Sequence, residues 1–223
     1  AFKPTYSLFK KKYLKDIFGL GFTFFIVQAS GIILYSTDNL IISNLFSPTE
    51  VVPYNVAFKY FSISAMVLSI IAVPFWSSFT DAFHKNDFQW IKKSMKSLSK
   101  IVVFLLILIL FMLLISSYAY KFWINDKVII PFSLSLLMSI FFLLSIIVTP
   151  FTMFLNGSGK VKMQALQSVF SALLNIPLSI YFAKELSFGV NGVILATIIC
   201  FIPSVIVAPI QYFKIINQKA NGI

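Results

Sequence analysis

Hydrophobic positions along the chain are gathered into six long windows, which short polar connections separate. The longest uninterrupted apolar run, residues 101–115, lies inside a window close to the roughly 20 residues that a helix needs to cross a bilayer. Helices satisfy their own backbone hydrogen bonds in a solvent that offers no partners. The pattern therefore predicts an all-α integral membrane protein built as a bundle of six transmembrane helices. The expected spans are residues 17–45, 56–80, 98–118, 128–155, 161–182 and 190–213.

Polar side chains recur at helical spacing inside the first, fourth and fifth spans. Amide groups are costly in hydrocarbon unless they find partners. These faces therefore point either at neighbouring helices or into a water-filled cavity, and the sequence leaves both alternatives open. The candidates for binding are Gln28 on the first span and Gln164, Gln167 and Asn175 on the fifth. The polar face of the fourth span is made of hydroxyl groups, those of Ser135, Ser139, Ser145, Thr149 and Thr152.

Asp38 in the first span and Lys59 in the second are charged residues in an apolar setting. A carboxylate within a membrane span is a functional candidate by default, here for proton or sodium coupling. The alternative is that Asp38 meets interfacial water near the outer end of its helix. Lys59 lies at a similar depth and is a candidate partner for Asp38 or for an anionic substrate. A lysine whose amine reaches back to the interface explains it equally simply.

The second and third spans carry different patterns. Ser62, Ala65, Ser69 and Ala72 on the second have the spacing of a face that lets helices approach closely. The third span is apolar on almost every face. We therefore expect the second span to pack within the bundle and the third to lie at its lipid-facing edge.

Composition and charge fix the environment and the orientation. With 59% hydrophobic and 11% charged residues, the chain lacks the polar surface of a water-soluble globule. All 18 basic residues are lysines, and 14 of them lie on the side that holds both chain ends. The positive-inside rule places that side in the cytoplasm, which predicts a multi-pass membrane protein with both termini cytoplasmic; the resemblance described below implies the bacterial inner membrane. The net charge of +11 is explained by anionic membrane lipids as partners, without nucleic acid.

Reactive chemistry is sparse in this sequence. The single cysteine, Cys200, falls inside the last span, and the single histidine, His84, falls in a polar connection. Neither a nucleophile system nor a metal cluster can be assembled from them. The sequence therefore predicts a protein that is not an enzyme and needs no cofactor.

Several segments resemble the polysaccharide biosynthesis family of O-antigen-type flippases, part of the superfamily that also includes multidrug and toxin extruders. The segments are 37–42, 53–61, 74–82, 87–92, 155–160 with Gln164 and Asn175 after it, and 189–197. The resemblance implies one lobe, the C-terminal one, of a transporter whose two six-helix lobes enclose a cavity and alternate between inward-open and outward-open states. The expected protein partner is then an N-terminal lobe, which lies outside this sequence.

The resemblance implies a flippase that moves undecaprenyl-pyrophosphate-linked oligosaccharide to the periplasmic leaflet. The cavity would be lined by the polar faces of the first, fourth and fifth spans. A cation-coupled exporter of the multidrug and toxin extrusion type is the alternative within transport. A structural membrane protein whose polar faces merely pack is the alternative outside transport.

Overall fold

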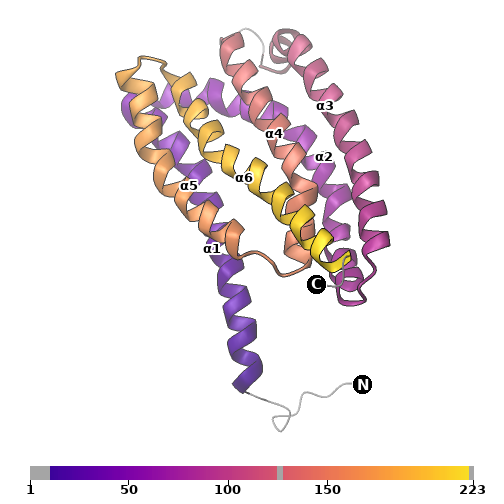
Figure 1. Ribbon diagram of the computed structural model, residues 1–223. Coiled ribbons are helices and arrows are strands. Elements are labelled where there is room, and N and C mark those ends of the chain that lie inside the picture. The colour runs from indigo at the N-terminus through magenta and orange to yellow at the C-terminus, as the bar shows by residue number, and fades with distance from the viewer. Residues whose placement is uncertain (1–10, 125–127, 221–223) are drawn as a thin grey trace, which may run out of the picture.

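The computed structural model describes residues 11–124 and 128–220, and within these residues the chain is helical, without a strand. The structure has six long helices, and Figure 1 shows the order in which they follow one another. A 3₁₀ turn precedes α2 and a π-helical turn follows α5. The helices are α1 (Lys11–Leu45), α2 (Val51–His84), α3 (Phe88–Ile124), α4 (Phe132–Gly157), α5 (Lys162–Ile180) and α6 (Val190–Ala220), with the short turns at Pro48–Glu50 and Tyr181–Glu185.

All six helices are long and apolar enough to cross a membrane, so the predicted all-α, six-helix membrane fold is confirmed. Three helices begin earlier than hydropathy predicts. Helix α1 starts at Lys11, α2 at Val51 and α3 at Phe88. The first part of α3 is rich in lysine, which hides it from a hydropathy window although lysine is a good helix former.

The helices form two sets that meet in the middle of the bundle (Figure 1). Helices α2, α3 and α4 pack together on one side, and α1 and α5 pack together on the other. Helix α6 contacts both α4 and α5 and so joins the two sets. Helix α3 lies at the edge, packed mainly on α2 and α4, and the N-terminal part of α1 projects beyond the other helices.

The core between α2 and α4 is dominated by aromatic and aliphatic side chains. On α2 the buried stripe runs through Tyr54, Ala57, Phe61, Leu68 and Phe79 at intervals typical of a helix face. Of the small-residue face predicted on this helix, Ala72 is buried in the core and Ala65 is half-buried and packs against it, whereas Ser62 and Ser69 are half-buried beside the stripe. The two alanines therefore take part in the expected packing face.

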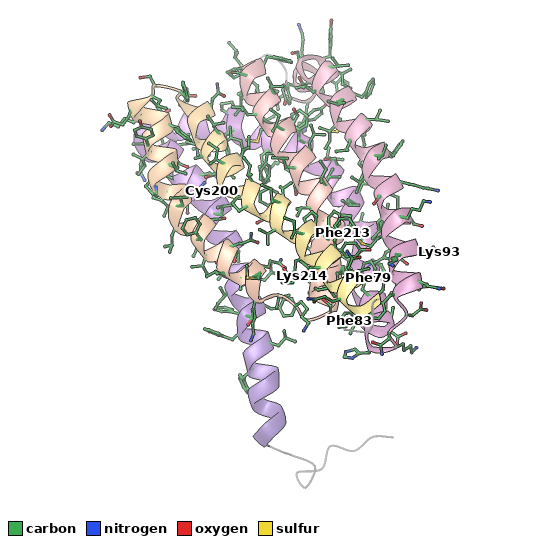
Figure 2. All side chains as sticks on the ribbon, viewed as in Figure 1. Phe79, Phe83, Lys93, Cys200, Phe213 and Lys214 are labelled. Atoms are coloured by element: carbon green, nitrogen blue, oxygen red, sulfur yellow. The ribbon has the colours of Figure 1, made fainter. Side chains whose placement is uncertain are left out.

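At one end of the bundle, α2 and α4 approach closely. A Cβ added to Gly157 would lie 2.8 Å from the carbonyl oxygen of Trp76 and 2.9 Å from Cβ of Phe79. Phe154 packs edge-on against both Phe79 and Tyr212, which brings α6 into the same cluster. Figure 2 labels Phe79 and Phe83 at this end of the bundle, and Phe83 also packs edge-on against Phe154. Glycine at position 157 is what permits this contact between backbones.

Candidate functional site

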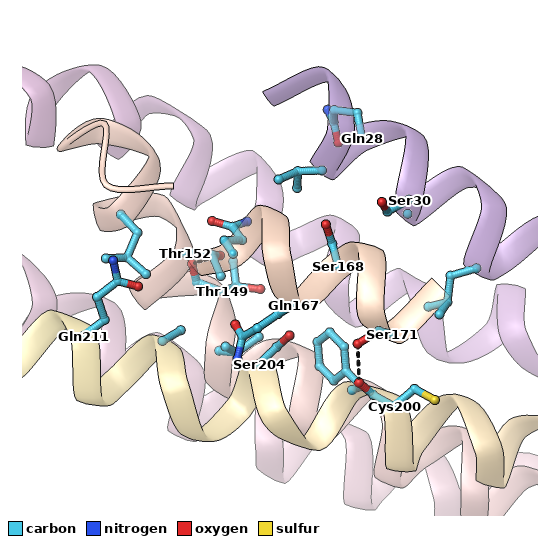
Figure 3. Close-up of a pocket in the computed structure, with 18 residues that line it drawn as sticks. Gln28, Ser30, Thr149, Thr152, Gln167, Ser168, Ser171, Cys200, Ser204 and Gln211 are labelled. Carbon is cyan, nitrogen blue, oxygen red and sulfur yellow. Dashed lines mark hydrogen bonds between the residues drawn. The ribbon is translucent and has the colours of Figure 1, made fainter. Parts of the chain in front are cut away.

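A cavity of about 270 Å³ lies between α1, α4, α5 and α6. Figure 3 shows that hydroxyl and amide groups from all four helices surround it. Among the described residues that line it, none carries a charge. The polar lining residues are Gln28, Ser30, Thr149, Thr152, Gln164, Gln167, Ser168, Ser171, Ser204 and Gln211.

The structure brings three of the predicted site residues to this cavity: Gln28, Gln164 and Gln167. The Nε2 amide of Gln167 donates a hydrogen bond to the carbonyl oxygen of Pro203, at 3.1 Å. The Oε1 atom of Gln164 is buried and has no partner among the described residues. A buried amide oxygen without a donor is rare, so the described residues leave the hydrogen bonding of Gln164 unsatisfied.

Helix α6 contributes the part of the cavity that the sequence did not reveal. Its lining groups include Ser204 and Gln211, and the Nε2 amide of Gln211 donates to the carbonyl oxygen of Lys160 at 2.9 Å. The backbone carbonyls of Cys200 and Pro203 accept bonds from α5. Carbonyl groups leave no trace in residue type. The two prolines inside α6, Pro203 and Pro209, lack the N–H groups that would bond to Ile199 and Val205, so they do not mark the Cys200 and Pro203 carbonyls either.

Asp38 lies outside the cavity lining, one helical turn from Leu34, which does line it. Its side chain is 1% exposed and accepts hydrogen bonds from two neutral hydroxyl groups. Tyr54 Oη donates to Oδ2 at 2.6 Å, and Thr197 Oγ1 lies 3.0 Å from the same oxygen. Asn175 Nδ2 in turn donates to Thr197 Oγ1 at 2.9 Å. Four helices thus meet at one buried carboxylate.

Asn175 and Thr197 form the end of a ladder of hydrogen bonds between α5 and α6. Gln167 reaches Pro203, Ser171 Oγ donates to the carbonyl oxygen of Cys200 at 2.7 Å (Figure 3), and Asn175 reaches Thr197. The α5 members lie four residues apart, so they share one helix face. The ladder runs from the cavity wall to the Asp38 carboxylate.

The similarity of this chain to known proteins agrees with that arrangement. A family model described as MatE matches residues 21–181, more than half of the chain. The chain belongs to the MatE family. No curated protein shows a significant match to the sequence.

Two solved structures share the fold of this MatE chain. One is a crystal structure of a MATE mutant, with a TM-score of 0.77 and 16% identity. The other is the outward-facing conformation of a multidrug resistance MATE family transporter of the MOP superfamily, with a TM-score of 0.76 and 17% identity. Each match covers 99% of this chain and 49% of the solved chain. The MatE chain therefore spans about half the length of these structures and has the fold of one half of a MATE transporter.

The MatE assignment corrects the prediction of an O-antigen-type flippase of the polysaccharide biosynthesis family. The predicted lipid-linked oligosaccharide partner and the polysaccharide export function are withdrawn with it. The cavity is consistent with this correction, because the described residues that line it include no cation to meet a pyrophosphate group.

Of the alternatives left open for Lys59, the ion pair with Asp38 is not the one that the structure has. Lys59 is exposed on α2, and no salt bridge joins it to Asp38 within the described ranges. Tyr54, one turn earlier on α2, takes the place beside the carboxylate instead. The rotation of α2 about its axis is set by its packing on α4, and that rotation turns Lys59 outward.

Proposed function

We propose that this MatE chain is one half of a multidrug and toxin extrusion transporter. The whole transporter exports amphipathic solutes by alternating access, in exchange for a proton or a sodium ion. It is not an enzyme, since its work is to expose one cavity to the two sides of the membrane in turn. Family membership and the uncharged polar cavity both support this function.

The observation that carries the proposal is the setting of Asp38. A carboxylate taken out of water is unfavourable unless hydrogen bonds or a cation compensate it. Here the donors are the neutral hydroxyls of Tyr54 and Thr197, and no ion pair to Asp38 is found in the described part of the chain. A proton or sodium ion bound at Asp38 would supply the missing positive charge, which makes this carboxylate the candidate coupling site.

The cavity suits a solute that is held by hydrogen bonds and apolar contact. Gln28, Gln164 and Gln167 are the candidate substrate-binding residues, because their amides can donate and accept at the cavity wall. The ladder of hydrogen bonds from Gln167 to Asn175 couples the two sites. Binding of a solute in the cavity therefore weakens binding of an ion at Asp38, and the reverse. When the ion takes up the Asp38 charge, Thr197 no longer needs to donate to it, and the contact between α5 and α6 is free to change.

A second half of the transporter is the expected protein partner. Large apolar side chains of the projecting helix α1, such as Phe18, Phe22 and Phe25, are exposed in this chain. The partner half and lipid would cover such surfaces. The lysine distribution supports an orientation with both ends of the chain in the cytoplasm, and we place the transporter in a bacterial inner membrane.

The test is export of a fluorescent organic cation by the complete transporter, with both halves present, from cells that lack other exporters. Asp38→Asn removes the charge while preserving the shape of the side chain, and we expect it to lower export at least tenfold at equal abundance in the membrane. Asp81→Asn is the matched control, because Asp81 is an exposed acid paired with Lys85 at the surface. Equal export by the Asp38 variant and the control would contradict the proposal.

A further inference from the structure

Four lysines near the start of α3 occupy one exposed face of the helix. Lys92, Lys96 and Lys100 follow one another at intervals of four residues, and Lys93 lies beside them. All four side chains are exposed, and Figure 2 shows Lys93 on the outer side of α3, away from the other helices. No acidic residue occurs anywhere in α3, so the positive charge of this face is not neutralised by its own helix.

The opposite face of the same segment is fixed against the core. Ile91 and Leu98 are completely buried, and Met95 is 5% exposed. Asp87 Oδ1 accepts a hydrogen bond from the backbone N–H of Trp90 at 2.9 Å and so caps the start of the helix. The lysines therefore stand on a rigid helix whose rotation is determined by packing.

The length of α3 sets the depth of these lysines in the membrane. Residues 101–120 carry no charge and, at 1.5 Å per residue, extend about 30 Å, the thickness of the hydrocarbon layer. Lys100 then lies at the boundary of that layer, Lys96 about 6 Å further out and Lys92 about 12 Å further out. Because the headgroup region of one leaflet is roughly 5–7 Å deep, Lys96 and Lys100 lie at the level of the lipid phosphates. Lys92 and Lys93 lie just beyond it, close to one Debye length of roughly 8–10 Å.

The lysine face continues along α3 into an exposed apolar face. Phe104, Ile107 and Leu114 are each more than half exposed and follow Lys100 at helical spacing. A lipid whose acyl chains lie along these residues would have its phosphate beside Lys100 and Lys96. A free anion in solution gains nothing from the apolar part of this surface.

We infer that Lys92, Lys93, Lys96 and Lys100 form a binding surface for anionic phospholipid headgroups in the leaflet at the N-terminal end of α3. The lysine ammonium groups donate hydrogen bonds to the phosphate oxygens and attract the negative charge of the leaflet. The inference depends on the position of α3 in a bilayer and is independent of what the transporter carries.

The test measures lipid binding by the full chain in a neutral detergent, as the rise in thermal stability on titration with phosphatidylglycerol or phosphatidylcholine. The variant K92Q/K93Q/K96Q/K100Q removes the four charges, and an all-arginine variant at the same positions keeps them. The matched control K85Q/K160Q/K162Q/K214Q also removes four lysine charges from the same side of the bundle, away from this face of α3. Each of these residues is exposed.

We expect the α3 glutamine variant to bind phosphatidylglycerol at least tenfold more weakly, while phosphatidylcholine binding and both other variants change less than about threefold. Inorganic phosphate at the same concentration should not compete. Equal weakening in the α3 and control glutamine variants would show that only net charge matters and would overturn the inference. Unchanged phosphatidylglycerol binding in the α3 variant, or full competition by phosphate, would overturn it as well.

Discussion

Replacement of Thr197 by valine isolates the hydrogen bonds that join Asp38 to α5 and α6. Valine has almost the same shape as threonine but cannot donate to Asp38 or accept from Asn175. The structure places the Thr197 hydroxyl 3.0 Å from Asp38 Oδ2 and 2.9 Å from Asn175 Nδ2, so one substitution breaks both contacts. Thr197→Ser keeps the hydroxyl and is the matched control.

The size of the effect follows from the burial of these groups. A hydrogen bond to a charged acceptor contributes about 1.5–3 kcal/mol, and a buried amide left without its acceptor costs about 1–3 kcal/mol. If about 2 kcal/mol of this falls on the ionised form of Asp38, that form becomes about 30-fold less favourable. A carboxylate that cannot release its coupling ion cannot complete the transport cycle, so export should fall by a similar factor.

The assay is uptake of a fluorescent organic cation into inverted membrane vesicles that contain the complete transporter, driven by an imposed proton or sodium gradient. Rates are divided by the amount of transporter in each vesicle preparation. We expect Thr197→Val to lose at least nine-tenths of the rate and Thr197→Ser to stay within about twofold of the natural protein. Wild-type rates for the valine variant would refute the role given to this network.

Two further predictions concern topology and packing. A cysteine at Lys162 should be protected from an impermeant thiol reagent in intact cells whereas one at Glu50 should react, because the lysine-rich side is predicted to be cytoplasmic; the reverse labelling pattern would invert the orientation. Gly157→Ala should destabilise the protein by about 1–3 kcal/mol, since its Cβ would meet the backbone of α2 at 2.8 Å, and thermal unfolding measures this. Gly21→Ala, where nothing lies within 4 Å, should change the melting temperature little, and equal shifts for the two variants would contradict the close approach.

The fold followed from hydropathy because membrane spans have a strong and simple pattern. What hydropathy missed was the first part of α3, where exposed Lys92 and Lys96 alternate with buried Ile91 and Met95. The mean hydropathy of such a segment is low, although the segment is helical and one of its faces is buried in the core. Helical periodicity rather than mean hydropathy carries the signal there.

The candidate site was predictable only where side chains reveal it. The amides Gln28, Gln164 and Gln167 stood out because such groups are rare in hydrocarbon, and the structure places all three at the cavity. Helix α6 contributes to the site partly through backbone carbonyls. Because every residue has a carbonyl group, the sequence does not show which of them take part. The pairing of Asp38 with Tyr54 rather than Lys59 depends on how α2 is rotated in its packing, and a single sequence does not specify that rotation.

The family resemblance failed for a related reason. The segments that suggested a polysaccharide flippase include helix ends and turns, such as 155–160 and 189–197, which position helices in a six-helix lobe. Substrate choice depends instead on the residues that line the cavity. The sequence does not show which residues of the four helices line the cavity. Only the structure shows that the described lining residues carry no charge.

The most direct test of ion-coupled export is to measure ion movement when substrate alone is supplied. Proteoliposomes that contain the complete transporter, with no ion gradient imposed, receive an outward gradient of a fluorescent organic cation while internal proton and sodium concentrations are recorded. Exchange through Asp38 predicts that substrate efflux drives one of the two ions inward, and that Asp38→Asn abolishes this movement while Asp81→Asn does not. Substrate efflux with no movement of either ion, or the same ion movement in the Asp38 variant, would contradict the account.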